Sequence, residues 1–280
     1  MSSVLFCECT DLCQWGTDIK YWLANSLPMG YQNQSTAWLL GGDNITFTGN
    51  GYGTLHGNGQ VWYDFAGGTS NYPRRPHALT ISNTTNSFFS GLRFIQSQMW
   101  TLTVIHSKNV LLQDVFVNNL KDDGGTTINT DGADTIYANN ITFDRWEVHN
   151  GDDAISPKAN STNITVTNSI FYRGTGLALG SIGQYKGVFE TIENFKAENI
   201  TCVGTTHALY MKTWTGQQVG YPPNGGGGGL GCMFSSPSTF ILTFDRYQIR
   251  SPQQLHPRQG SKYTHLHISM YDFLWCGRRL

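Results

Sequence analysis

The sequence has few charged residues and no excess of either sign. Charged residues make up 13% of the 280 residues, with 18 Lys and Arg against 19 Asp and Glu, so the net charge is −1. A protein that binds nucleic acid through a broad basic surface needs a strong positive balance. We therefore expect no nucleic-acid partner, and any acidic substrate must be held by a few local cations.

The chain also lacks a long apolar run. No stretch approaches the roughly 20 apolar residues of a membrane span, so no membrane partner is expected. The beginning, MSSVLFCECTDLCQWG, does not resemble a secretory leader, because Glu8 and Asp11 break its short apolar stretch. Frequent N-x-S/T sequons nevertheless favour an extracellular, secreted glycoprotein. The sequons begin at Asn33, Asn44, Asn83, Asn140, Asn160, Asn163 and Asn199.

Cysteine is scarce and badly spaced for a metal. Cys7, Cys9 and Cys13 are three of the six cysteines, but no His or second Cys pair follows near them to complete a tetrahedral zinc site. We predict neither a metal nor another cofactor. Disulfides remain an alternative, and their pairing cannot be read from the spacing.

Glycine and a repeated asparagine, by contrast, are abundant. The chain has 32 Gly, and several segments start with Asn and then alternate apolar and polar residues over five to seven positions, the period of a half-buried strand. These segments begin at Asn44, Asn86, Asn109, Asn140, Asn163 and Asn194. The last five follow one another at steps of 23, 31, 23 and 31 residues.

This long period distinguishes between two all-β architectures. A sandwich or an up-and-down barrel needs turns every 8–12 residues or so, whereas a solenoid repeats at more than about 20 residues, each unit stacking on the last. The repeat predicts an all-β fold: a single-stranded, right-handed parallel β-helix with one coil per repeat Asn. Each Asn should lie at a turn, in the left-handed conformation, and hydrogen-bond to its copies in the adjacent coils.

Adjacent coils of such a helix lie about 4.8 Å apart, so residues distant in sequence share a face. Counted from the repeat Asn, Asp152 and Asp153 lie at +12 and +13, and Thr175 of the next coil lies at +12. Asp131 lies at +22 of a coil that is eight residues longer, hence near +14 if the insertion precedes it. We expect the three carboxyl groups within about 10 Å, at the surface of one groove.

Clustered carboxylates of this kind point to cleavage of a glycosidic bond. That reaction needs a carboxylic acid to protonate the leaving oxygen and a carboxylate to activate water or to attack. Packing three aspartates together raises at least one pKa and so keeps an acid protonated. Asp122 and Asp123, in contrast, are interpreted as turn residues of a polar insertion.

Several motifs together resemble glycoside hydrolase family 28, the polygalacturonase and rhamnogalacturonase family of pectin lyase-like parallel β-helices. They are NTDG at Asn129–Gly132, GDD at Gly151–Asp153, GTGLALGSIGQY at Gly174–Tyr185, GYGTLHGNGQVWYDF at Gly51–Phe65 and KTWTG at Lys212–Gly216. The resemblance implies that Asp152 is the general acid, that Asp131 and Asp153 position and deprotonate water, and that the reaction proceeds with inversion. It also implies that Lys212 binds a substrate carboxylate. The residues expected to contact substrate are Lys212, Tyr210, Thr175, Asn129 and Tyr185.

Two positions depart from the family pattern. Polygalacturonases carry a G-H-G histidine where this chain has Thr175, and an arginine where it has Tyr210. Losing both removes a cation and a bidentate clamp for a carboxylate. This resembles the exo-acting branch, which includes exo-galacturonidases and α-L-rhamnosidases. Tyr185, Tyr210 and Trp214 could stack on sugars or simply pack, and His149 and His207 are candidates for a replacement contact.

The functional prediction is hydrolysis of pectic polysaccharide or oligosaccharide, galacturonan or rhamnogalacturonan, by an exo-acting monomer. The alternatives are an α-L-rhamnosidase that releases terminal rhamnose, a non-catalytic carbohydrate-binding β-helix, which would not need the aspartates, and a polysaccharide lyase. A lyase needs a basic residue, and the motif itself supplies none beside the carboxylates.

The catalytic domain is predicted to span residues 1–231, with the family likeness starting at about residue 15. Residues 232–280 lack the asparagine register and are interpreted as an atypical tail, for which a gene-model artefact is one explanation.

Overall fold

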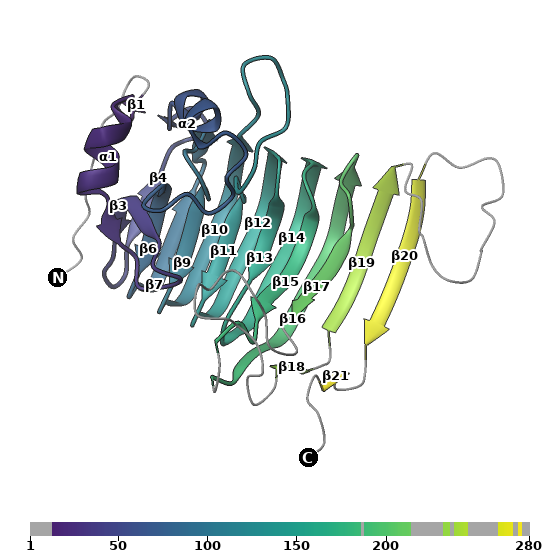
Figure 1. The fold of residues 1–280 in the computed structure, drawn as a ribbon. Helices are drawn as coiled ribbons and strands as arrows, with labels where there is room; N and C mark the ends of the chain where they lie inside the picture. Colours follow the sequence, from purple (N-terminus) through teal and green to yellow (C-terminus); the bar gives the residue numbers. More distant parts are fainter. Residues whose placement is uncertain are drawn as a thin grey trace.

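The computed structural model describes residues 13–185, 188–213, 232–235, 238–245, 263–270 and 274–275. Almost every described element is a β-strand, and the strands stack side by side along one axis (Figure 1). Short turns link the strands into successive coils, as the repeat predicts. No described helix is long and apolar enough to cross a membrane.

The strands form two sheets, of 13 and 8 strands. The first, here named the asparagine sheet, contains β1 (Cys13–Gln14), β4 (Thr46–Thr48), β5 (Thr54–His56), β7 (Thr85–Ser90), β8 (Arg93–Ile95), β10 (Lys108–Asn118), β12 (Asn139–Asn150), β14 (Ser161–Arg173), β16 (Glu190–Val203), β18 (Cys232–Ser235), β19 (Ser238–Asp245), β20 (Tyr263–Met270) and β21 (Leu274–Trp275). The second, named the short-strand sheet, contains β2 (Leu27–Pro28), β3 (Ser35–Leu40), β6 (Pro76–Ser82), β9 (Leu102–Ile105), β11 (Ala133–Ile136), β13 (Asp153–Pro157), β15 (Gly176–Ile182) and β17 (Leu209–Thr213).

From β8 to β18 the chain alternates between the two sheets, and the strands of each sheet pair in parallel except for β2–β3, β18–β21 and β19–β20. In the asparagine sheet Val110 pairs with Ile141, Ile141 with Ile164, and Ile164 with Phe195. These positions follow the repeat Asn directly, and all four side chains lie in one buried core cluster. Burying such stacked aliphatic and aromatic side chains is the main stabilising contribution to the coils. The predicted parallel β-helix is confirmed.

The repeat asparagines form a ladder along one edge of the coils. Asn86, Asn109, Asn140, Asn163 and Asn194 all have positive φ, between 51° and 57°, which Asn tolerates better than most residues. The Nδ2 of Asn109 donates to the Oδ1 of Asn86 at 2.9 Å, and the Nδ2 of Asn140 donates to the Oδ1 of Asn109 at 3.0 Å. Asn194 donates in the same way to Asn163 at 3.1 Å. The left-handed conformation and the hydrogen bonds of these three pairs agree with the prediction. The asparagines lie within strands β7, β10, β12, β14 and β16, however, and not at turns between strands.

The N-terminal part carries the two described helices, drawn in purple and blue in Figure 1. Helix α1 (Ile19–Asn25) begins after Asp18, whose side chain accepts the Tyr21 amide, and α2 (Gly59–Ala66) precedes β6. Strands β2 and β3 pair antiparallel, and the turn between them contributes Met29 and Tyr31 to a second buried cluster with Trp100. This turn therefore covers part of the short-strand sheet.

At the other end, β19 pairs in parallel with β16, and β20 pairs antiparallel with β19. The asparagine sheet thus continues past residue 231. The boundary proposed there from composition stays a prediction.

Candidate active site

Three aspartates lie where successive strands of the short-strand sheet begin. Asp131 precedes β11, and Asp153 is the first residue of β13, with Asp152 just before it. Ala133 pairs with Ile155, so Asp131 is level with Asp153 rather than one residue further on, as counting from the sequence suggested. The insertion does precede Asp131, but the segment from the repeat Asn to Asp131 is nine residues longer than the segment from the next repeat Asn to Asp153, not eight. Thr175 is level with Asp152, as predicted, and donates its amide to the Asp152 carbonyl at 2.9 Å.

Buried asparagine amides fix the backbone around these aspartates. The Nδ2 of Asn150 donates to the carbonyl of Asp153 at 2.7 Å and to that of Thr130 at 3.2 Å. Gly151 is required by a close approach, because a Cβ there would lie 2.0 Å from the carbonyl oxygen of Thr127. The NTDG and GDD segments are thus tied together through backbone contacts that tolerate little displacement.

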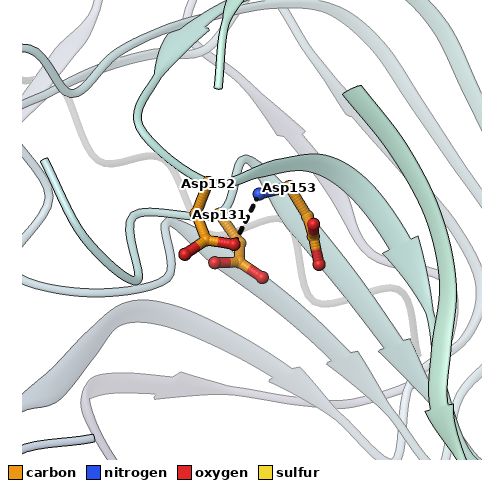
Figure 2. A group of neighbouring side chains, drawn as sticks. All are labelled: Asp131, Asp152 and Asp153. Carbon is orange, nitrogen blue, oxygen red and sulfur yellow. Dashed lines mark hydrogen bonds between the residues drawn. The ribbon is translucent and has the colours of Figure 1, made fainter. Parts of the chain in front are cut away.

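The carboxyl groups converge more tightly than predicted (Figure 2). One carboxylate oxygen from each of Asp131, Asp152 and Asp153 lies within 4.8 Å of the other two. Asp153 also donates its amide to the Oδ1 of Asp152 at 2.9 Å. The predicted surface position is wrong for two of the three, since Asp131 is 3% exposed and Asp153 is fully buried. Asp152 alone is partly exposed, so it is the carboxyl group that an incoming ligand reaches first.

Asp153 is surrounded by donors. Its Oδ1 accepts the hydroxyl of Thr175 at 2.6 Å and the hydroxyl of Tyr210, and its Oδ2 accepts the Lys212 ammonium. Burial alone would raise the pKa of Asp153, but the charges of Lys212 and Lys158 outweigh burial and hold the pKa below its ordinary value. Asp153 is therefore the ionised member of the group.

The other two aspartates favour their protonated forms. Burial raises the pKa of Asp131 well above its ordinary value, and the charge of Asp152 raises it further. Burial also raises the pKa of Asp152, as does the charge of Asp153. The Oδ1 of Asp131 has no hydrogen-bond partner among the residues that the structure describes. The pKa values of the three carboxyl groups are thus driven apart, downward for Asp153 and upward for Asp131 and Asp152.

Tyr210 and Lys212 both donate to Asp153, and the expectation that they also contact substrate stays a prediction. The Tyr210 ring stacks on His207 with 4.7 Å between ring centroids, so one ring face is covered and unavailable to a sugar. Its hydroxyl serves Asp153, as does the Lys212 ammonium, whose side chain is 27% exposed. Burial would lower the pKa of Lys212, but Asp153 and Asp131 raise it, so Lys212 remains a cation. His149, the other candidate histidine, bonds to Glu147 at 2.8 Å.

Asn129 and Tyr185 have contacts within the protein, and their expected role as substrate contacts stays a prediction. The backbone amide of Asn129 donates to the Oδ2 of Asp152 at 3.1 Å, while its side chain bonds to Ser70 and Asn71. Tyr185 packs against the second buried cluster. Trp214 lies outside the described residues, as does the segment with Cys7 and Cys9. Cys202 has a free, buried thiol, and Asp122 and Asp123 are exposed in the insertion, as predicted for turn residues.

Sequence patterns missed two buried cations near the aspartates. Lys158 is 3% exposed and lies 3.0 Å from the Oδ1 of Asp134. Arg75 is 2% exposed and donates to the carbonyls of Gln98, at 2.5 Å, and Ile128, at 3.0 Å. A lysine directly after an uninterrupted buried strand was a usable signal for Lys158. Arg75 lies in a loop just before Pro76, where no periodicity marks it.

A chain of polar side chains was missed as well. The Nε2 of Gln32 donates to Gln184, and Gln34 donates to the side chains of Gln32, at 3.2 Å, and Asn71, at 3.5 Å. Asn129 donates to the same Asn71 oxygen at 2.8 Å. The β2–β3 turn is thereby linked to the aspartates. Residues 29–34 show no repeat that could have predicted this contact.

The donor set fits proton chemistry better than a metal. Three converging carboxylates could hold a divalent cation. Here, however, Lys212 already neutralises Asp153, and the raised pKa values of Asp131 and Asp152 favour protons.

The lysines also matter for the lyase alternative, because the motif has no basic residue but the fold brings Lys212 and Lys158 close to the aspartates. Lys212 is held as a cation by Asp153 and is therefore a poor proton acceptor.

Comparison with known proteins gives consistent results. A family model described as glycosyl hydrolases family 28 matches residues 7–221. The α-L-rhamnosidase rgxB of Aspergillus niger is 64% identical over 229 residues, which cover 82% of this chain and 53% of that protein. A putative galacturan 1,4-α-galacturonidase A of Aspergillus flavus is 39% identical over 226 residues, 76% of this chain and 52% of that protein. The chain spans about half the length of the curated relatives it matches.

Solved structures resemble the fold. The endo-xylogalacturonan hydrolase of Aspergillus tubingensis has a TM-score of 0.64 at 24% identity, over 75% of this chain and 53% of that one. A hyperthermoactive exopolygalacturonase of Thermotoga maritima has a TM-score of 0.58 at 17% identity, over 73% of this chain and 55% of that one. At such low identity these structures support the β-helix and nothing finer.

Proposed function

Because the chain belongs to glycosyl hydrolase family 28, we propose that it is a pectin-degrading glycoside hydrolase that releases terminal α-L-rhamnose from rhamnogalacturonan fragments. Its 64% identity to an α-L-rhamnosidase supports this over galacturonan cleavage, where the identity to the galacturonidase relative is 39%. The main prediction from sequence was exo-acting hydrolysis of galacturonan or rhamnogalacturonan, with an α-L-rhamnosidase as an alternative. An exo-galacturonidase is the second candidate here.

The observation that carries the proposal is that the cationic side chains near the aspartates already have partners within the protein. Among the residues that the structure describes, Lys212 is engaged by Asp153, Lys158 by Asp134, and Arg75 by two backbone carbonyls. A uronate carboxylate beside the aspartates would therefore have to compete for cations that are already engaged, and burying a charge without a dedicated partner is costly. A neutral sugar such as rhamnose avoids this cost.

The proposed mechanism follows from the exposure and the pKa shifts of the three aspartates. Asp152, partly exposed and with a raised pKa, donates a proton to the glycosidic oxygen as the bond to the anomeric carbon breaks. Asp153 accepts a proton from the attacking water through the remaining lone pair of its Oδ2, to which Lys212 donates. Asp131, whose pKa is raised by burial, positions that water. The water oxygen bonds to the anomeric carbon, so the product is the free sugar.

We propose inversion, although the carboxyl groups are close. Inverting enzymes usually separate them by about 6.5–9.5 Å and retaining enzymes by about 5–5.5 Å, whereas the nearest oxygens here lie within 4.8 Å. A retaining mechanism would need Asp153 or Asp131 as nucleophile. Three donated hydrogen bonds lower the nucleophilicity of the Asp153 carboxylate, and the raised pKa of Asp131 disfavours its carboxylate form, so neither suits direct attack. Both suit the handling of a water molecule.

We also propose exo action, secretion and a monomeric state. A row of hydrogen-bonded side chains lies beside the aspartates and would obstruct a polymer that runs through the site. It consists of Gln184, Gln32, Gln34, Asn71 and Asn129.

Secretion is supported by the sequon asparagines, which are all exposed. They are Asn33, Asn44, Asn83, Asn140, Asn160, Asn163 and Asn199.

The proposal is tested by incubating the purified chain with rhamnosyl-terminated rhamnogalacturonan oligosaccharides and, separately, with polygalacturonate. We expect free rhamnose from the first and little product or viscosity change from the second, with EDTA making no difference because no step uses a metal. NMR of the first product should give the anomer opposite to that of the substrate. Galacturonate release from polygalacturonate at an equal or higher rate would assign the second candidate, and a rapid viscosity fall would exclude exo action.

Specificity should respond to the two positions that depart from the family. In a Tyr210→Arg, Thr175→His variant, a guanidinium replaces one phenolic donor to Asp153 and leaves further N–H groups for a substrate carboxylate. One charge-assisted hydrogen bond contributes about 1.5–3 kcal/mol, so kcat/KM for galacturonate-terminated oligosaccharides should rise by about tenfold or more relative to rhamnosyl substrates. Tyr210→Phe, which removes only the hydroxyl, should lower both rates without this shift. An unchanged ratio in the double variant would show that preference is set elsewhere.

A further inference from the structure

A cavity lined by two cations lies beside helix α2. It is enclosed by α2, the loop that follows α2 and the insertion that carries Asp122, whose amide donates to the Gln60 side chain of α2 at 2.9 Å (Figure 1). Its volume is about 100 Å³, and its lining includes Arg75, Lys121 and three threonines but, among the described residues, no acidic one. A single water molecule needs about 10–15 Å³ of such space, so the cavity can hold several waters or a carboxylate with part of its sugar.

Both cations keep charge and donors that the protein does not use. The guanidinium of Arg75 has five N–H groups, of which two donate to backbone carbonyls, at 2.5 and 3.0 Å. Carbonyl oxygens carry no net charge, and within the described part of the chain neither Arg75 nor Lys121 forms an ion pair with a carboxylate. The acids that follow Lys121 have other partners, since Asp122 accepts the Gln96 side chain at 2.6 Å and Asp123 a backbone amide at 2.7 Å. The cavity thus holds two positive charges without a direct counter-ion, which favours an anionic ligand.

A single peptide group separates this cavity from the proposed general acid. The Nη2 of Arg75 donates to the carbonyl oxygen of Ile128 at 3.0 Å. The N–H of the same peptide group, on Asn129, donates to the Oδ2 of Asp152 at 3.1 Å. The general acid protonates the glycosidic oxygen, which stays with the leaving sugar, so the leaving sugar lies on the Asp152 side of the cleaved bond. The cavity is therefore next to the place of the leaving sugar.

We propose that this cavity binds the carboxylate of the galacturonate that carries the terminal rhamnose, with Arg75 and Lys121 as its cations. This rests on the proposed hydrolase function and specifies the leaving sugar. A guanidinium with free N–H groups suits a planar carboxylate, and an ammonium adds a second charge. The neutral sugar then lies at the aspartates and the acidic sugar at the cavity, which is the order of the two sugars at a rhamnose-terminated end of rhamnogalacturonan.

The test compares a rhamnosyl-galacturonate disaccharide with the same disaccharide whose carboxyl group has been reduced to an alcohol. The wild-type protein should hydrolyse the acid form with a kcat/KM about tenfold or more above that of the reduced form, the effect of a charge-assisted hydrogen bond. Lys121→Gln, at a partly exposed position that should tolerate the change, should lose most of this preference through a higher KM for the acid form. Lys108→Gln, at an exposed position of β10, is the matched control and should keep the wild-type preference.

A binding measurement that does not depend on turnover accompanies the kinetics. In the Asp152→Asn protein, calorimetric titration should show tighter binding of the acid disaccharide than of the reduced one. Adding Lys121→Gln should remove the difference, and adding Lys108→Gln should not. Inorganic phosphate, titrated alone, should bind more weakly than the acid disaccharide because it lacks the sugar. Phosphate binding of equal strength would show a general anion site and overturn the assignment to a sugar acid.

The outcomes separate the subsite from the activity. An equal kcat/KM for the acid and reduced forms in the wild-type protein, or a preference that survives in Lys121→Gln, would overturn the subsite and leave the hydrolase assignment standing. A protein that releases no rhamnose, but whose tighter binding of the acid form still depends on Lys121, would overturn the hydrolase assignment and leave the subsite standing.

Discussion

Replacing Asp152 with Asn should reduce turnover by about 10²–10⁴-fold, the usual contribution of a general acid, while thermal stability stays nearly unchanged. The amide is isosteric but has no proton to give at a pKa near the working pH. Asp152 is the member of the group that combines partial exposure with a raised pKa, so no neighbour can replace it without moving. The measurement is kcat on rhamnosyl oligosaccharides, together with the melting temperature.

Stability should hold because Asn keeps the acceptor oxygen that Asp152 offers. Its Oδ1 accepts the amide of Asp153 at 2.9 Å and its Oδ2 that of Asn129 at 3.1 Å, and an Asn side chain can retain one of these bonds. Asp123→Asn in the exposed insertion is the matched control and should change neither rate nor melting temperature. Full activity in Asp152→Asn would remove Asp152 as the acid and point to Asp131, whose pKa is also raised.

The spacing of one residue type was enough to predict the fold. The repeat Asn satisfies two requirements at once: a positive φ within the strand and a side-chain amide that can bond in both directions along the axis. Because each copy meets the same demands, the register of Val110, Ile141 and Ile164 could be read from the spacing alone. The prediction failed by one residue at Asp131, where loop length replaces strand register as the determinant.

The contacts within the site could not be predicted in the same way. Lys212 bonds to Asp153 across 59 residues and two coils, and whether its side chain reaches that carboxylate or a substrate depends on rotamer and burial. The sequence alone does not decide whether the Tyr210 ring stacks on a sugar or packs within the protein. The structure shows His207 stacked on the ring. The asparagine at position 129 was marked by its motif, yet the partners Ser70 and Asn71 come from a loop without periodicity.

Replacing Trp146 with Ala should cost about 3–5 kcal/mol of the free energy of unfolding, the range for removing a fully buried Trp. Trp146 is 1% exposed and packs edge-to-face against Phe143 with 5.2 Å between ring centroids. Its Nε1 donates to the carbonyl of Leu112 at 3.0 Å in the preceding coil. Truncation therefore opens a cavity between the sheets and also leaves a buried carbonyl without its donor.

The midpoint of urea denaturation measures this cost, and the slope of the transition should stay close to that of the wild type. Trp146→Phe retains most of the volume and loses the hydrogen bond, so its midpoint should fall by clearly less. Glu147→Ala, at the neighbouring position with a 47% exposed carboxylate, should stay within about 1 kcal/mol of wild type because the side chain packs against little. An equal loss in Trp146→Ala and Glu147→Ala would mean that the stacked core does not determine stability. Below its lowered transition Trp146→Ala should remain active, in contrast to Asp152→Asn, because Trp146 supports the coil that carries Asp152 without contacting the aspartates.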